Sequence, residues 1–236
     1  MLLIDAYTIE FLSNEWITNI LISASFIILF LTIGKCLSHK HNLLIVKLLC
    51  FVLFLITIFH FFYLLFHDIW NIKEHLPLHL CSINGIISIF ILLIRSNKDL
   101  FEFNFYGGVI GGAVAIITPQ LNDYDGSLTQ YIIYFISHGL IIIIPLYLYY
   151  YLNFKLRRLS WLRSVIYLTI IGLIFIPLNS FLKSNYMYVN SPPKVNNLLI
   201  IGEWPIYLVN LEIIIILLFF ITYCVFTKVS AFTPSK

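Results

Sequence analysis

The chain has 236 residues, of which 61% are hydrophobic and only 11% are charged, and its formal net charge is +3. A soluble globular domain carries about 25% charged residues, and a water-exposed fold of this size could not cover so many Ile, Leu and Phe side chains. The composition excludes a water-soluble fold and predicts an all-α, polytopic membrane protein, with residues 1–236 forming a single transmembrane domain. Because the first fifteen residues contain three acids and no Lys or Arg, we expect the first apolar stretch to be a retained span.

Seven apolar stretches approach the length of about 20 residues that an α-helix needs to cross a bilayer. The fourth is short and glycine-rich, which favours close packing against other helices over contact with lipid. If the fourth stretch were re-entrant, every later segment would lie on the opposite side of the membrane. The predicted spans are 16–37, 43–66, 76–94, 103–118, 129–151, 162–182 and 203–227.

The basic residues favour seven spans, with the N-terminus outside and the C-terminus in the cytoplasm. Omitting the fourth span would place Arg157, Arg158 and Arg163 outside, against the positive-inside rule. We therefore expect a multi-pass protein of the cell membrane. With seven spans, eleven basic residues lie inside (Lys35, Lys40, Lys47, Arg95, Lys98, Lys155, Arg157, Arg158, Arg163, Lys228 and Lys236) and three outside (Lys73, Lys183 and Lys194), whereas Asp5 and Asp123 are among the outer acids.

The four cysteines are scattered along the chain and form no CxxC pair. Their spacing predicts neither a disulfide framework nor a zinc site, and a thiol within an apolar stretch commonly behaves as a small hydrophobe. We expect no cofactor, no metal centre and no nucleic-acid partner, and the sequence sets no oligomeric state. The cysteines are Cys36, Cys50, Cys81 and Cys224.

Polar side chains within the predicted spans lie towards the outer ends, roughly 5 to 14 Å below the outer boundary at 1.5 Å per residue. Polar groups at such depths are expensive, and a functional role is the default interpretation. Each also has a structural alternative, such as a protonated Glu212 bonded to a neighbouring helix or a packing role for His138. The candidates within the spans are His60, His79, Cys81, Asn84, His138 and Glu212, and Asn122 and Asn185 lie near the same outer ends.

The densest polar cluster opens the third predicted span. Pro77 is suited to the first turn of a helix, where its missing N–H costs nothing. His75 and His79 would share a face and could bind a metal with a third ligand, although HxxxH alone is a weak pattern. Cys81 would face away from His79 and share a face with Asn84, so it could act as a nucleophile if a histidine from another span removed its proton.

Several motifs resemble those of the YwaF-type bacterial membrane proteins, which are related to the eukaryotic transmembrane protein 164 family. The matching motifs occur in family order between about residues 60 and 210. The most specific is the string Pro-Leu-His-Leu-Cys with a downstream Ser-His-Gly. The motifs are residues 76–81 (LPLHLC), 107–113 (GGVIGGA), 117–119 (ITP), 137–139 (SHG), 185–187 (NYM) and 202–207 (GEWPIY).

The resemblance implies lipid acyl chemistry, because the eukaryotic members look like acyltransferases that form an acyl-cysteine intermediate. Carried over by motif, Cys81 would be the nucleophile and His138 the general base. The substrate would be a membrane lipid, and His79, Asn84 or Asn122 could stabilise the oxyanion. Glu212 would orient a histidine or bind a headgroup amine.

Three functions therefore stay open at the level of sequence. The first is a lipid acyltransferase or acyl hydrolase with a Cys81–His138 pair near the outer leaflet. The second is a small-solute or proton-coupled transporter that uses Glu212, His138 and His60. The third is a non-catalytic protein that grips a lipid headgroup with the same polar cluster.

Overall fold

The structure is a computed structural model that describes residues 6–94, 96–122, 124–193 and 199–232, with side chains described as far as Lys228. Arg95, Lys194 and Lys236, together with the acids Asp5 and Asp123, lie outside the described residues. The described chain forms seven α-helices: α1 (Asn14–Lys35), α2 (His39–Phe66), α3 (Leu80–Phe90), α4 (Lys98–Ile117), α5 (Leu128–Tyr151), α6 (Ser160–Leu182) and α7 (Ile206–Phe232). It also forms a short 3-10 helix, η1 (Tyr186–Tyr188), and two strands, β1 (Tyr7–Thr8) and β2 (Gln120–Leu121).

The helical, polytopic architecture predicted from composition is confirmed. Six helices of the described chain, α1, α2, α4, α5, α6 and α7, are long and apolar enough to cross a membrane. The predicted third span, 76–94, is different, because only Leu80–Phe90 forms an α-helix, which is about 16 Å long at 1.5 Å per residue. The placement of Pro77 in the first turn of that helix is wrong. The helix begins after His79, whose backbone is extended.

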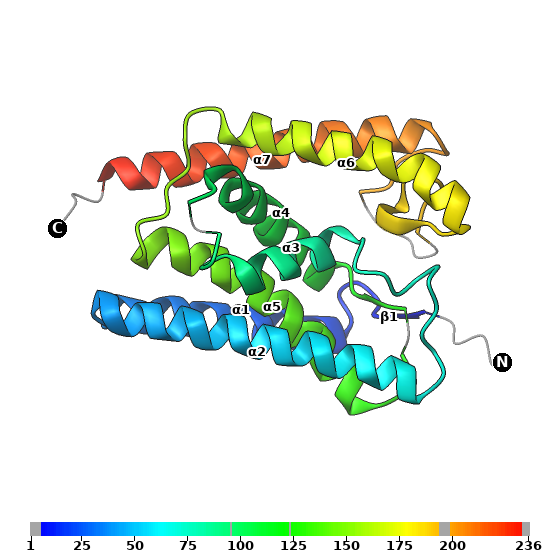
Figure 1. Cartoon of the computed structure of the whole chain (residues 1–236), viewed down its shortest axis with the longest axis horizontal. Coiled ribbons are helices and arrows are strands. Elements are labelled where there is room, and N and C mark those ends of the chain that lie inside the picture. Colours follow the sequence, from blue (N-terminus) through cyan, green and yellow to red (C-terminus); the bar gives the residue numbers. More distant parts are fainter. Residues whose placement is uncertain (1–5, 95, 123, 194–198, 233–236) are drawn as a thin grey trace.

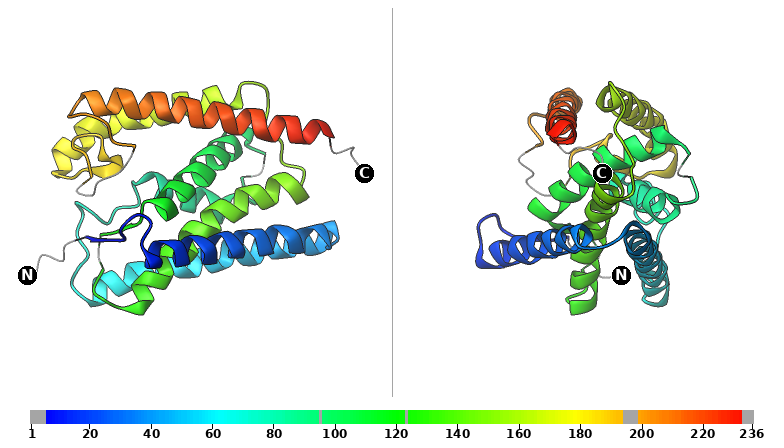
Figure 2. Two further views of the ribbon diagram at one scale, coloured as in Figure 1. Left: turned by 180° about the vertical axis from the view of Figure 1, so that it is seen from behind. Right: turned by 90° about the vertical axis from the view of Figure 1, so that its left-hand side faces the viewer.

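The helices form three layers, which Figure 1 shows from one side. Helices α6 and α7 pack together as one outer layer, α1, α2 and α5 lie on the opposite side, and α4 with the short α3 lies between them (Figures 1 and 2). Helices α2 and α4 run in the same direction, because the chain returns through α3 between them, and the two termini lie at opposite ends of the molecule (Figure 1). Because α1, α2 and α7 are mostly unburied and apolar, their outward faces are suited to contact with lipid.

Helices α4 and α5 form the centre of the molecule. Gly108 approaches α5 so closely that a Cβ there would lie 2.9 Å from the carbonyl oxygen of Ile141. One turn further on, a Cβ on Gly112 would lie 2.7 Å from Ile142 Cγ1 and 3.1 Å from the carbonyl oxygen of His138. These contacts confirm the expected close packing of the glycine-rich stretch, because only a residue without a Cβ allows this approach.

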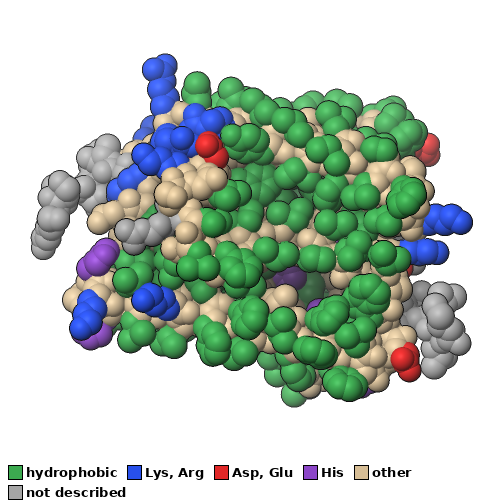
Figure 3. Space-filling model, in the orientation of Figure 1, with side chains coloured by type: hydrophobic (Ala, Val, Ile, Leu, Met, Phe, Trp, Pro, Cys, Tyr) green, Lys and Arg blue, Asp and Glu red, His purple; other side chains and the backbone are tan. Residues whose placement is uncertain are grey.

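A buried carboxylate joins the helices at the end where the C-terminus lies. Glu102 of α4, with only 1% of its side chain exposed, accepts hydrogen bonds from Arg157 N (2.8 Å), Arg157 Nε (2.9 Å) and an Arg163 guanidinium nitrogen (3.0 Å). These bonds to Glu102 raise the pKa of the Arg157 guanidinium, so it stays charged. Figure 3 shows Lys and Arg side chains gathered at this end.

Replacing Glu102 with Gln is expected to lower the free energy of unfolding by about 3 kcal/mol, because two arginines lose a buried counter-charge. The matched control is Asp99→Asn. Asp99 also contacts Arg157, but 42% of its side chain is exposed, so its loss should cost about 1 kcal/mol or less. Detergent-titration unfolding of the purified variants measures both values. Equal losses would contradict the central role of Glu102.

Candidate functional site

A cavity of about 1000 Å³ lies between the layers and has walls from α2 through α7. Figure 3 shows a hollow between the hydrophobic side chains, with histidine side chains inside it. Of the predicted site residues, the described wall includes His60, His79, Cys81, Asn122, His138 and Glu212 but neither Asn84 nor Asn185.

Cys81 occupies the first turn of α3, two residues after the N-cap residue His79. The first intrahelical hydrogen bond runs from Ile83 N to His79 O (2.9 Å), so the N–H groups of Cys81 and Ser82 have no partner within the helix. Among the described residues, the His79 side chain makes no capping bond. The sulfur of Cys81 lies 3.7 Å from the position that a Cβ on Gly111 would occupy. The thiol therefore lies between the N-terminus of α3 and the part of α4 where Gly111 has no side chain.

His138 lies on α5, and its Nδ1 is 2.7 Å from the carbonyl oxygen of Tyr134. A carbonyl oxygen only accepts hydrogen bonds, so Nδ1 carries the proton, and the lone pair of the neutral ring is on Nε2. The phenol of Tyr134 packs against the imidazole with ring centroids 4.4 Å apart. Tyr134 therefore fixes both the tautomer and the orientation of His138.

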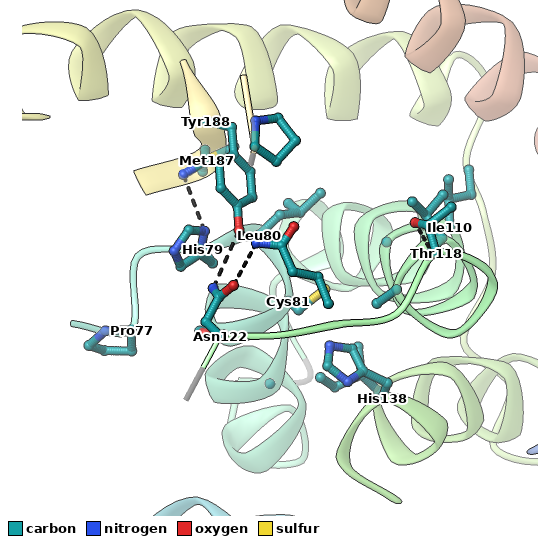
Figure 4. A pocket seen from close by; sticks show the side chains of 18 of the residues that line it. Pro77, His79, Leu80, Cys81, Ile110, Thr118, Asn122, His138, Met187 and Tyr188 are labelled. Atoms are coloured by element: carbon teal, nitrogen blue, oxygen red, sulfur yellow. Dashed lines mark hydrogen bonds between the residues drawn. The ribbon is translucent and has the colours of Figure 1, made fainter. Parts of the chain in front are cut away.

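Cys81 and His138 approach the same turn of α4. The Cys81 sulfur packs against Gly111, and the His138 carbonyl packs against the next residue, Gly112. Consecutive Cα atoms are 3.8 Å apart, so Cys81 of α3 and the His138 backbone of α5 contact α4 at nearly the same level, and both side chains line the cavity. Figure 4 shows both side chains in one part of the cavity.

Glu212 and His60 line other parts of the wall. Glu212, on α7, accepts a hydrogen bond from the Thr169 hydroxyl of α6 (2.6 Å), which links the two helices of that layer. His60 lines the cavity from α2, on the opposite side of the central pair (Figure 2). The structure thus places an acid and a second imidazole in the same cavity as Cys81 and His138.

His79 and Asn122 line the cavity beside η1 and β2. His79 Nδ1 accepts a hydrogen bond from Met187 N (3.4 Å), and its ring lies beside those of Tyr186 and Tyr188. Asn122 accepts a hydrogen bond from Gln120 Nε2 (2.6 Å). Both residues therefore connect the core to the segments that cover the cavity.

Asn84 and Asn185 have structural contacts outside the cavity wall. Asn84 donates to Leu80 O (2.8 Å) and faces α4, where a Cβ on Gly107 would lie 2.7 Å from its Nδ2. Its Oδ1 is buried without a hydrogen-bond partner in the part of the chain that the structure describes. Asn185 donates to Ser191 O (2.8 Å) and so closes the loop after α6.

The alternative metal site at His75 and His79 is not supported by the geometry. Both residues precede α3, so they do not share a helix face, and His75 Nδ1 accepts a hydrogen bond from Asn71 N (2.9 Å). Within the described ranges, no three His, Cys, Asp or Glu side chains are grouped to hold a metal ion.

Sequence reasoning missed the tyrosines and Gln120 around the site. Tyr134 could have been found, because it precedes His138 by four residues and so shares its helix face. Tyr188 and Gln120 could not, since they reach the cavity from segments outside the long helices.

The model of the TMEM164 family matches residues 11–223, a range that includes every residue of the cavity wall. Comparison with curated proteins and with solved structures gave no match. The resemblance to the transmembrane protein 164 family is confirmed.

The glycine contacts on α4 give a stability prediction. Gly108→Ala should lower the free energy of unfolding by about 1–3 kcal/mol, because the new methyl group meets the α5 backbone and forces the helices apart. In the control variant Gly172→Ala, the new Cβ meets a neighbouring side chain, at Val189 Cγ1, only at 3.9 Å, so the stability of this variant should be unchanged. Detergent-titration unfolding distinguishes the two. A Gly108→Ala protein as stable as wild type would refute close α4–α5 packing.

Proposed function

Because this chain belongs to the TMEM164 family, we propose that it is an integral membrane lipid acyltransferase or acyl hydrolase in which Cys81 is the nucleophile and His138 the general base. The proposal rests on one observation. A thiol in the first turn of α3 and an imidazole protonated on Nδ1 line a single cavity, on two helices that pack against the same glycine-rich turn of α4. A Cys–His pair needs these two groups, with the base oriented by a third.

The proposed topology has seven crossings, with the N-terminus outside and the C-terminus in the cytoplasm. In Figure 1, α2 ends and α4 begins at opposite ends of the molecule, so the chain between them traverses its length. Helix α3 spans about 16 Å, roughly half of the 30 Å of a hydrocarbon core, and in this topology the non-helical residues 75–79 cross the remainder. The basic end then faces the cytoplasm, and the cavity mouth faces outwards.

The first half of the proposed reaction acylates Cys81. His138 Nε2 accepts the thiol proton, the sulfur attacks the ester carbonyl of a membrane lipid, and the carbon–oxygen ester bond breaks. The leaving lipid oxygen takes the proton back from His138 Nε2. In the second half, an acceptor hydroxyl gives its proton to His138 and attacks the thioester, and the released sulfur recovers that proton.

The N-terminus of α3 is placed to stabilise the negative charge that develops in this reaction. The N–H groups of Cys81 and Ser82 lack partners within the helix and can donate to the oxyanion of the tetrahedral intermediate. Asn84 takes no part, because it faces Gly107.

Cys81→Ala is expected to abolish covalent labelling by an acyl probe directed at thiols, since the sulfur that carries the acyl group is missing. His138→Gln should slow the labelling by about 10²–10⁴-fold, because the general base is lost. Cys224→Ala is the matched control, since Cys224 lies on α7 beyond the described cavity wall, and should label like wild type. In-gel fluorescence of the labelled proteins measures all three. If Cys81→Ala is labelled as strongly as the wild-type protein, Cys81 is not the nucleophile and the proposal is refuted.

Proton-coupled transport is a second candidate, favoured by the Glu212 carboxyl group in the cavity wall. If the cavity is a transport pathway, Glu212→Gln abolishes proton-coupled uptake in proteoliposomes, whereas Cys81→Ser retains it. The enzyme proposal predicts the reverse pattern for lipid turnover, with activity lost in Cys81→Ser. Lipid that copurifies without turnover would instead indicate a binding protein.

A further inference from the structure

Three side chains cover the cavity at its outer end, and we call them the outer clasp: Gln120, Asn122 and Tyr188. The Gln120 side-chain amide donates to Asn122 Oδ1 (2.6 Å) and to the Tyr188 hydroxyl (3.4 Å). Asn122 Nδ2 donates to the same hydroxyl (3.5 Å). Figure 4 shows Tyr188 pointing from η1 towards Asn122, close to Cys81. All three residues belong to the cavity wall.

The backbone on each side of the clasp is firmly anchored. Strand β2 pairs with β1, where Thr8 is opposite Gln120. On the other side, Tyr186 N donates to Asn179 Oδ1 (2.8 Å), and the Tyr207 hydroxyl donates to Tyr188 O. The two halves of the clasp are therefore held by contacts that do not depend on each other.

The bridge between the two halves is much weaker than these anchors. Its bonds to the Tyr188 hydroxyl are 3.4 and 3.5 Å long, whereas hydrogen bonds of this kind are usually 2.7–3.2 Å long. Both bonds are neutral and meet at one oxygen atom. The clasp therefore opens most readily between Tyr188 and the two amides.

The side walls of the cavity differ from its mouth. Val209 and Ile213 of α7 belong to the wall and are 62% and 51% exposed. Ile86 of α3 is likewise both a wall residue and exposed. Exposed apolar side chains are suited to contact with hydrocarbon, so this part of the wall offers an apolar molecule a route from lipid that avoids the polar mouth.

We propose that the outer clasp is a water seal that decides where the acyl group of Cys81 goes. This inference rests on the proposed acyl-cysteine chemistry. With the clasp closed, water is kept from the thioester, and the attacking hydroxyl belongs to a lipid that enters through the apolar side walls. With the clasp open, water attacks instead, the carbon–sulfur bond breaks, and a free fatty acid is released. The clasp thus sets the balance between acyl transfer and hydrolysis.

Tyr188→Phe tests the seal, because it removes the hydroxyl that joins the two halves and keeps the aromatic ring. The ratio of free fatty acid to transfer product, measured with a labelled phospholipid donor and a lysophospholipid acceptor, should rise about fivefold, the equivalent of one hydrogen bond. Gln120→Ala should change the ratio in the same direction. Tyr167→Phe is the matched control, since Tyr167 lies exposed on α6, and should leave the ratio unchanged.

A second measurement does not depend on turnover. A charged, membrane-impermeant methanethiosulfonate added outside the cell should modify Cys81 about fivefold faster in Tyr188→Phe than in the parent protein, both carrying Cys36→Ser and Cys224→Ser. Equal modification rates, or an equal rise in Tyr167→Phe, would overturn the seal. If Cys81 is modified faster but no acyl group is ever found on it, the enzyme proposal is refuted. The proposed balance between acyl transfer and hydrolysis then fails as well.

Discussion

The close approach of α4 and α5 is the constraint on which the site depends. Gly108 and Gly112 allow the two helix backbones to touch, and the neighbouring face of α4 accepts the Cys81 sulfur of α3 at Gly111. In a bilayer, packing of this kind replaces the hydrophobic effect as the force between helices, because lipid is as apolar as the side chains. The glycines therefore set the positions of α3 and α5 at once, and with them the thiol and the imidazole.

The polar groups at this level are satisfied locally, as an apolar surrounding requires. His138 donates to the backbone carbonyl of Tyr134, four residues earlier on the same helix, and the Tyr134 hydroxyl donates to Ala115 O (2.8 Å) and accepts from Gln120 N (3.3 Å). The Tyr134 carbonyl thus accepts the Nδ1 hydrogen bond of His138, a role that a carboxylate has in many catalytic triads. It orients the ring without placing another charge in the membrane, and it connects the base through Tyr134 to strand β2.

Hydrophobic length identified six of the helices within a few residues, because a span is a local property of the sequence. It failed at the third predicted span, where the non-helical segment before α3 is stabilised by a distant contact, the Tyr186 hydroxyl that accepts a hydrogen bond from Leu76 N (2.9 Å). The cavity residues Cys81 and His138 were found from motif and depth. Asn84 was assigned to the oxyanion, yet it faces Gly107, since helical periodicity gives relative faces and not which neighbour each face meets.

The two ends of the molecule are closed by different interactions. At the basic end, Glu102 holds two arginines through short, charged hydrogen bonds that lie largely out of water, and such bonds are roughly twice as strong as neutral ones. At the other end, neutral amides reach Tyr188 at the limit of hydrogen-bond length. The proposed opening is therefore at the end where these neutral bonds lie. Because Cys81 lies near that end, its access to water can change while the helix packing around His138 stays fixed.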